Sequence, residues 1–296
     1  MKNKYLSILY ISIIYLISLG IAYIVFNQLT ISSLILRILI ADVVATLIIY
    51  VISLVLKNAS LYDPYWSVIP PILLAFVMFK YQLVTFESLL LIIPILIWSL
   101  RLTYNWAKLW QGFQEMDWRY INFKKHYPKI YFLINLFGIQ LMPTLIVYAQ
   151  IAVGINYLMA NPTASLLTYI GAIIIVLAAV TQFISDSQMQ AFKNKNKGKK
   201  MCIDEGLWKF SRHPNYLGEI MVWWGVYIIY ISVFKSLDLW ILAPIAMTLL
   251  FYYISIPLME NKILSNRPEY ARYQKHVSKL LLLPRKGMQS EISTQD

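Results

Sequence analysis

The sequence predicts an all-α membrane protein: a polytopic transmembrane helical bundle of about eight spans, with both termini in the cytoplasm. Three observations lead to this fold class. Of the 296 residues, 59% are hydrophobic and only 14% are charged, whereas a soluble domain has about 45–50% apolar and about 25% charged residues. The apolar residues gather in runs long enough to cross a bilayer, which takes about 20 residues of helix. The charged residues gather between those runs.

Eight apolar runs are the candidate spans, and they lie at residues 6–26, 34–56, 65–81, 86–104, 130–157, 164–184, 216–234 and 238–258. The first follows two lysines, as the apolar part of a signal peptide does, but it is too long for one and no small-residue cleavage site follows it. We therefore expect a retained span. The third run is the weakest, because it is short and contains Pro70 and Pro71.

Basic residues set the expected orientation. With a cytoplasmic N-terminus, the outer loops hold only Lys80 and Lys235, and the other loop lysines and arginines lie inside. This asymmetry is what the positive-inside rule predicts. It holds only if the number of spans is even, so that both termini lie on the same side. The segment 259–283 is polar and basic, which predicts an amphipathic helix at the membrane surface.

Composition also excludes several kinds of site. The formal net charge is +12, but charges in loops between apolar runs suit anionic headgroups or a polyphosphate ligand better than nucleic acid. Cys202 is the single cysteine and the three histidines are dispersed, so we expect no disulfide and no metal site. Neither GxGxxG nor GxxxxGK[ST] occurs, so any nucleotide would be held outside a Rossmann domain or a P-loop.

A polar cluster opens the seventh span, in the stretch LWKFSRHPNYLGEIMVWW at residues 207–224. Arg212 and His213 precede a proline suited to the first turn of a helix, and Asn215 and Glu219 share one helix face four residues apart. An intramembrane carboxylate normally faces a protein interior or a polar ligand. A helix N-terminus beside an arginine suits a phosphate.

Two upstream features fit a nucleotide as well. Asp186 leaves the sixth span at its inner end, and Lys193 follows two turns later on the same face. The carboxylate suits hydrogen bonds from ribose or adenine, and a run of lysines suits phosphates: Lys193, Lys195, Lys197, Lys199 and Lys200. Arg101, near the inner end of the fourth span, could contact a phosphate or ribose.

A structural alternative stays open for each group. Arg212 and Arg101 could extend toward the membrane surface only to keep their charges in water. Asn215 could cap the helix, and Glu219 could pair with a basic residue on another helix. The lysine-rich tract could be an orientation signal in a solvated loop.

Together these segments resemble the signature of membrane proteins with a steroid 5-alpha-reductase C-terminal domain. The resemblance covers roughly residues 60–284 and includes GLWKFSRHPNYLGEIMVWWG, IWSLRLTYNW, EMDWRY, SDSQMQAFK and the ending MENK…PEYARY…LLLLP. It implies a helical-bundle enzyme that binds NADPH from the cytoplasmic side. Such an enzyme reduces an activated carbon–carbon double bond of a steroid-like or other lipid.

The resemblance implies roles for the residues of the cofactor site. Asn215 and Glu219 correspond to the pair near the nicotinamide, and the signature residues Arg212, His213 and Tyr216 are assigned to cofactor binding with them. Asp186 and Lys193 correspond to adenosine and phosphate contacts, and Arg101 to an arginine that touches the cofactor.

The resemblance also implies an acid that polarises the substrate carbonyl, at Asp63 in LYDPYWSVIPP. Asp63 and Glu219 are therefore the expected catalytic residues. The phenol that partners this acid in steroid reductases has no counterpart around Glu87. A structural alternative for Asp63 is a cap on the third helix, ahead of a proline.

The expected domain organisation has three parts. Residues 1–60 hold two spans without a recognisable motif, residues 61–284 form the reductase-like catalytic domain, and residues 285–296 are expected to be a disordered tail. The expected partners are a lipid or steroid-like substrate and membrane lipids, with no nucleic acid and no protein partner implied. The membrane would be the plasma membrane in a bacterium and an endomembrane in a eukaryote.

Two rival functions stay open. Membrane methyltransferases of the isoprenylcysteine and phospholipid type share the R-H-P-x-Y helix start and a late E…Y-x-x-Y segment, and would bind S-adenosylmethionine. Gly218 followed by Glu219, and Asp186 seven residues before Lys193, are closer to the reductases. The second rival is a non-enzymatic lipid-binding or transport protein, with a polar path lined by Asp42, Asp63 and Glu219. For Asp42, pairing with Arg37 and membership of such a path are both open.

Overall fold

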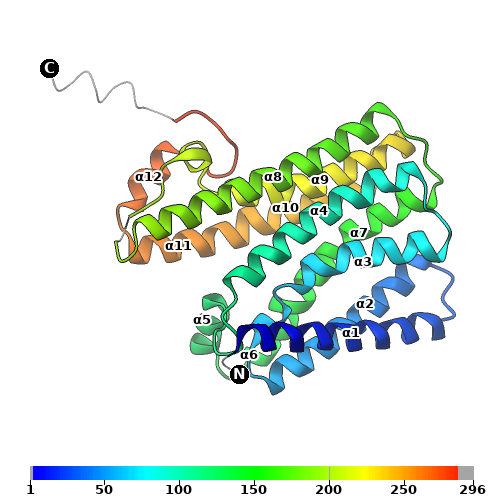
Figure 1. Ribbon diagram of the computed structural model, residues 1–296, viewed down its shortest axis with the longest axis horizontal. Coiled ribbons are helices and arrows are strands. Elements are labelled where there is room, and N and C mark those ends of the chain that lie inside the picture. Colours follow the sequence, from blue (N-terminus) through cyan, green and yellow to red (C-terminus); the bar gives the residue numbers. More distant parts are fainter. Residues whose placement is uncertain (1–2, 200, 286–296) are drawn as a thin grey trace. The chain divides into compact units, whose positions relative to one another are not determined.

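The computed structural model describes residues 3–199 and 201–285, and within these ranges the chain is helical (Figure 1). The described part of the chain has no strand, only an isolated bridge between Ser211 and Ser278. Eight helical segments there are long and apolar enough to cross a membrane: Lys4–Gln28, Leu34–Val55, Ala59–Lys80, Phe86–Leu109, Tyr131–Met159, Leu166–Lys195, Pro214–Phe234 and Leu239–Asn266. The predicted fold class is confirmed, and the orientation of the termini stays a prediction.

The chain divides into two compact units, Met1–Thr163 (unit 1) and Ala164–Asp296 (unit 2). The division falls inside the predicted catalytic domain of residues 61–284. Of the predicted tail, residues 286–296 lie outside the described residues.

Unit 1 contains the first five spans. Its elements in order are α1 (Lys4–Gln28), α2 (Leu34–Val55), η1 (Ala59–Tyr62), α3 (Tyr65–Lys80), α4 (Phe86–Leu109), α5 (Trp118–His126), α6 (Tyr131–Leu133), the π-helical η2 (Ile134–Leu141) and α7 (Met142–Met159). Polar side chains start several of these helices. The Asn3 side chain accepts hydrogen bonds from two amides of α1, and Thr85 and Ser88 form a capping box at the start of α4.

The third predicted span is a helix in spite of its prolines. Pro70 and Pro71 lie inside α3 and are buried. The turn η1 extends this segment to 22 residues.

Unit 2 contains the last three spans. Its elements are α8 (Leu166–Lys195), η3 (Gly206–Lys209), α9 (Pro214–Phe234), η4 (Leu239–Ile241), α10 (Leu242–Leu249), the π-helical η5 (Leu250–Ser255), α11 (Ile256–Asn266) and α12 (Tyr270–His276). The helix α8 continues well beyond the predicted end of the sixth span at residue 184. The predicted sites Asp186 and Lys193 therefore lie on one continuous helix.

The helices α8 and α9 pack side by side along their length (Figure 1). Glycines permit this close approach. A Cβ atom on Gly171 would lie 2.7 Å from the carbonyl oxygen of Gly225, and one on Gly218 would lie 2.8 Å from that of Ala178. Because larger residues at these places would force the backbones apart, the small residues set the distance between the two helices.

The segment 259–283 is not the single amphipathic helix that the sequence predicts. The helix α11 ends at Asn266, since Pro268 disfavours a helical conformation at Arg267, which is extended (φ −147°, ψ 83°). After this break, α12 is only seven residues long, and residues 277–285 form no further helix.

Candidate functional site

The start of α9 lies beside the C-terminal part of α8 and carries several of the predicted cofactor-site residues. The amide Nδ2 of Asn215 donates a hydrogen bond to Oδ1 of Asp186 at 3.3 Å. The Asn215 side-chain oxygen accepts from the backbone N–H of Tyr216 at 3.0 Å, so this residue also satisfies a free amide of the first helical turn. The structure therefore brings together two predicted site residues that lie 29 positions apart in the sequence.

Glu219 is buried, with 3% of its surface exposed, one turn further along α9. Its Oε2 accepts from Nε2 of Gln182 at 2.7 Å, and its Oε1 accepts from the indole N–H of Trp223 at 3.1 Å. The Gln182 side chain passes close to Gly218, where a Cβ atom would lie 2.5 Å from it. The glycine before Glu219 thus makes room for the side chain that binds the carboxylate.

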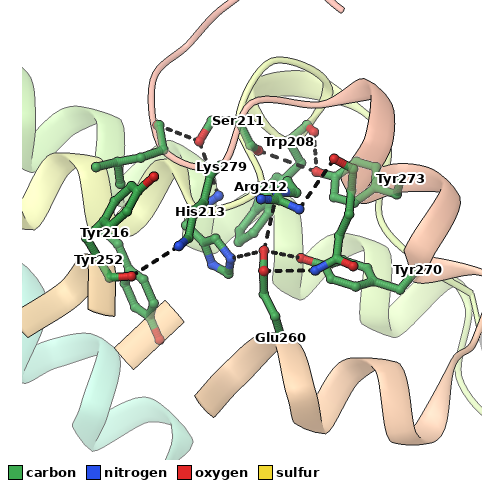
Figure 2. Close-up of polar contacts among 12 residues, drawn as sticks. Trp208, Ser211, Arg212, His213, Tyr216, Tyr252, Glu260, Tyr270, Tyr273 and Lys279 are labelled. Atoms are coloured by element: carbon green, nitrogen blue, oxygen red, sulfur yellow. Dashed lines mark hydrogen bonds and ion pairs between the residues drawn. The ribbon is translucent and has the colours of Figure 1, made fainter. Parts of the chain in front are cut away.

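A second carboxylate, Glu260 of α11, contacts three hydrogen-bond partners and forms an ion pair with Arg212 (Figure 2). Its Oε1 lies 3.2 Å from Nε of Arg212 and 3.0 Å from Nε2 of His213, and accepts from the Tyr270 hydroxyl at 3.3 Å. Its Oε2 accepts from the amide of Gln274 at 2.8 Å. We call these five residues the Glu260 cluster.

In the Glu260 cluster, Arg212 and His213 are less accessible to a ligand than the sequence suggests. The sequence places both at the membrane surface, available to a phosphate. In the structure their side chains are only 10% and 4% exposed, and both face the internal carboxylate Glu260. Their role as cofactor contacts stays a prediction.

His213 precedes α9 and lies flat against Tyr216, with ring centroids 5.3 Å apart and an interplanar angle of 7°. Burial lowers the pKa of His213, and the neighbouring charge of Arg212 acts in the same direction, while Glu260 opposes both. A carboxylate can only accept hydrogen bonds, so the neutral ring carries its proton on Nε2 and donates it to Glu260. Tyr216 also packs against Phe251, with centroids 4.9 Å apart.

The segment after α12 holds the loop that leads into α9. The Arg212 amide donates to the Ser278 carbonyl at 2.9 Å, the Ser211 hydroxyl donates to the Leu280 carbonyl at 2.7 Å, and the Leu283 amide donates to the Phe210 carbonyl at 3.2 Å. These bonds fix the backbone from which Arg212 and the His213 side chain project (Figure 2).

The remaining predicted cofactor-site residues are the lysines at the end of α8 and Arg101 of unit 1. Lys193 is exposed in the last turn of α8, two turns beyond Asp186, and Lys195, Lys197 and Lys199 are exposed as well. Lys200 lies outside the described residues. Arg101 is half-buried on α4, in unit 1.

Asp63 has a phenol partner that sequence reasoning missed. The Tyr120 hydroxyl donates to Oδ1 of Asp63 at 2.6 Å. Burial raises the pKa of Tyr120 well above its usual value, so its hydroxyl keeps the proton that it donates. Asp63 does not cap α3, whose N-cap is Pro64 without a side-chain hydrogen bond.

Tyr120 is held in place by its own neighbours in the EMDWRY stretch. The Asp117 backbone N–H donates to the Ser60 hydroxyl at 2.8 Å, and Arg119 forms an ion pair with Asp117 at 2.8 Å. This stretch was already part of the resemblance, but nothing in its spacing connects it to Asp63, 57 residues earlier. Among the described residues no group of three His, Cys, Asp or Glu side chains could hold a metal ion.

Comparison with known proteins gives a family and one relative. The model of a family described as "Protein of unknown function (DUF1295)" matches residues 49–277, and the chain belongs to this family. An uncharacterized protein of Schizosaccharomyces pombe, C594.04c, is 24% identical over 254 residues, which cover 77% of this chain and 74% of the relative. No solved structure matches the chain.

Proposed function

We propose that this DUF1295 protein is a membrane-embedded reductase that uses NADPH to reduce an activated carbon–carbon double bond in a steroid-like or other lipid. The proposal depends on one observation above all. Asp186 of α8 and Asn215 of α9 are hydrogen-bonded to each other, and Lys193 follows Asp186 on the same helix. These are a carboxylate, an amide and a cation to which the resemblance to steroid 5-alpha-reductases assigns cofactor binding.

The chemistry of these side chains fits a dinucleotide in part. The Asp186 carboxylate can accept from ribose hydroxyls, the Asn215 amide can both donate and accept, and exposed lysines at the end of α8 can pair with phosphates. Arg212 and His213 fit less well, because Glu260 already neutralises the arginine and accepts from the histidine. We therefore assign the phosphates to Lys193 and the lysines that follow it.

The reduction needs a hydride and a proton. NADPH, when bound, supplies the hydride. The protein's part is to orient the two reactants, to exclude water, and to donate a hydrogen bond to the carbonyl oxygen that gains charge. In the structure the single proton of the Tyr120 phenol is donated to Asp63, so the pair suits this last task when the Asp63 carboxyl itself carries a proton and donates it to the substrate carbonyl. Glu219, held by Gln182 and Trp223, orients the amide end of the nicotinamide.

Titration of the purified protein with NADPH, followed by tryptophan fluorescence, tests the proposal. A hydrogen bond to a charged group contributes about 1.5–3 kcal/mol, so Asp186→Asn is expected to raise Kd by about 10- to 100-fold. Lys193→Ala should also raise the Kd for NADPH. The control is Lys235→Ala, an exposed lysine at the opposite end of α9. Equal affinity of wild type and Asp186→Asn would contradict the assignment.

A second candidate function is methyl transfer from S-adenosylmethionine. The observation that favours it is the Glu260 cluster, which joins the R-H-P-x-Y helix start to the late glutamate and Tyr270, the elements shared with membrane methyltransferases. The same titration with S-adenosylmethionine separates the two. Binding of S-adenosylmethionine without binding of NADPH would replace the reductase by a methyltransferase.

A further inference from the structure

Polar side chains line one buried face of α2, in unit 1. Asp42, Thr46 and Ser53 follow one another at spacings of four and seven residues, so they share a helix face. They are 2%, 0% and 1% exposed. A polar face inside a membrane-spanning helix costs free energy unless its groups find partners within the protein.

Most of this face does find partners. The Thr46 and Thr144 hydroxyls lie 3.1 Å apart, and the Tyr62 hydroxyl lies 2.7 Å from that of Thr144. The Ser53 hydroxyl accepts from the amides of Asn135 and Gln140, at 3.1 and 3.0 Å.

Asp42 is the exception, because only one of its two carboxyl oxygens has a hydrogen-bond partner. The Tyr65 hydroxyl donates to Oδ1 at 2.6 Å. Oδ2 is buried and has no hydrogen-bond partner among the residues that the structure describes. No basic side chain of residues 3–199 and 201–285 pairs with Asp42 either.

The sequence leaves open a pair between Asp42 and Arg37, and the structure does not form it. The guanidinium of Arg37 donates to the Phe26 carbonyl at 3.0 Å and lies 4.2 Å from the centre of the Phe26 ring. Asp42 thus belongs to the polar face of α2 rather than to an ion pair.

The position of Asp42 makes a bare negative charge costly. It lies eight residues after Leu34 and 13 before Val55 (42 − 34 and 55 − 42), which is about 12 Å and about 20 Å from the two helix ends. An unpaired carboxylate at such a depth is among the most costly groups in a membrane protein. A proton on Oδ2 removes that charge, so the carboxyl then needs no counterion.

We propose that Asp42 is a proton-binding site, which carries its proton on Oδ2 as a neutral carboxylic acid while Oδ1 accepts from Tyr65. The ligand of this site is a proton. One helical turn along α2, the hydroxyls of Thr46, Thr144 and Tyr62 are bonded to one another, and each can both accept and donate a proton.

The groups that face Asp42 are mostly neutral, so they leave its charge uncompensated. Its own helix contributes only the cation of Arg37, which is engaged elsewhere. The elements packed against this region contribute tyrosines and threonine: Tyr15 of α1, Tyr62 of η1, Tyr65 of α3, and Thr144 and Tyr148 of α7. None of these carries a positive charge that could hold Asp42 ionised.

Infrared spectroscopy of the purified protein in lipid tests the proposal. A protonated carboxyl has a C=O stretch above the amide I band, and an ionised one does not. We expect wild type to show such a band near neutral pH, and Asp42→Asn to lose it. The control is Asp238→Asn, since Asp238 also accepts from a tyrosine hydroxyl, that of Tyr230, but lies at the loop end of α9.

A second variant keeps the test decisive if Asp42→Asn fails to fold. Tyr65→Phe leaves the acid in place but removes the hydrogen bond to Oδ1, so it should shift the band without abolishing it. A band unchanged in both variants would overturn the proposal. So would a band that sodium ions remove from wild type, because Asp42 would then be a ligand of a metal cation.

Discussion

Replacing Glu260 by alanine is the perturbation for which the structure gives the clearest magnitude. Three hydrogen bonds and an ion pair with Arg212 converge on this carboxylate, and the side chains of Glu260 and Arg212 are both 10% exposed. Removing one partner of a buried ion pair costs about 3–5 kcal/mol, because the other charge is left uncompensated. Glu260→Ala should therefore lower the free energy of unfolding by about 3–5 kcal/mol, a factor of about 10²–10⁴ in the equilibrium constant.

The assay is equilibrium unfolding in mixed detergent micelles, followed by tryptophan fluorescence. Trp208 reports on this region, since the Tyr273 hydroxyl donates to its carbonyl and its indole N–H donates to the Ser185 carbonyl at 3.0 Å. The matched control is Glu269→Ala, which removes an exposed carboxylate nine residues later and should change stability little.

A double variant separates the charge from the packing. In Arg212→Leu with Glu260→Leu no charge of this pair remains buried, so this protein should be more stable than Glu260→Ala alone. A loss below about 1 kcal/mol in Glu260→Ala would refute the reasoning, because Arg212 would then not depend on this carboxylate.

Three further predictions use the same unfolding assay. Gly225→Leu should separate α8 from α9, since a Cβ atom there would lie 2.5 Å from Ile175 and 2.9 Å from the Gly171 carbonyl. A loss beyond about 3 kcal/mol is expected, and a smaller one would show that the helices can shift apart. Burial lowers the pKa of His213 below its usual 6.5, so the unfolded chain binds more protons below that value. Stability should be complete above about pH 6.5 and fall by up to about 1.4 kcal/mol per pH unit below it. His213→Gln should flatten this dependence, and an unchanged pH profile would contradict the prediction. Tyr120→Phe should cost about 1.5–3 kcal/mol, because Asp63 loses the hydroxyl bonded to it at 2.6 Å. Unchanged stability would show that water replaces the phenol.

The spans could be read from the sequence because the membrane imposes a length and a polarity on each of them. All eight apolar runs became helices within the described residues, including the run with Pro70 and Pro71. Local rules also predicted the helix start at Pro214. These features depend on neighbouring residues or on a repeating pattern, which a sequence displays directly.

The partners of the polar groups could not be read in the same way. Arg212 and His213 looked free for a phosphate because Glu260 lies 47 residues beyond His213, on a helix of its own. Tyr120 reaches Asp63 across 57 residues. Such pairs form through tertiary packing, and no local pattern marks which carboxylate a given donor will meet. The resemblance predicted an acid at Asp63, and the structure shows that its phenol partner is Tyr120.

The pairing of Ser211 with the segment around Leu280 has a consequence for biosynthesis. The two partners are 69 residues apart, with α9, α10, α11 and α12 between them. While the ribosome is still adding those helices, the loop that carries Arg212 and His213 lacks its hydrogen bonds to the segment around Leu280. The candidate site can therefore take its final form only after the last span has been inserted, so a chain that stalls there leaves the loop exposed to proteases.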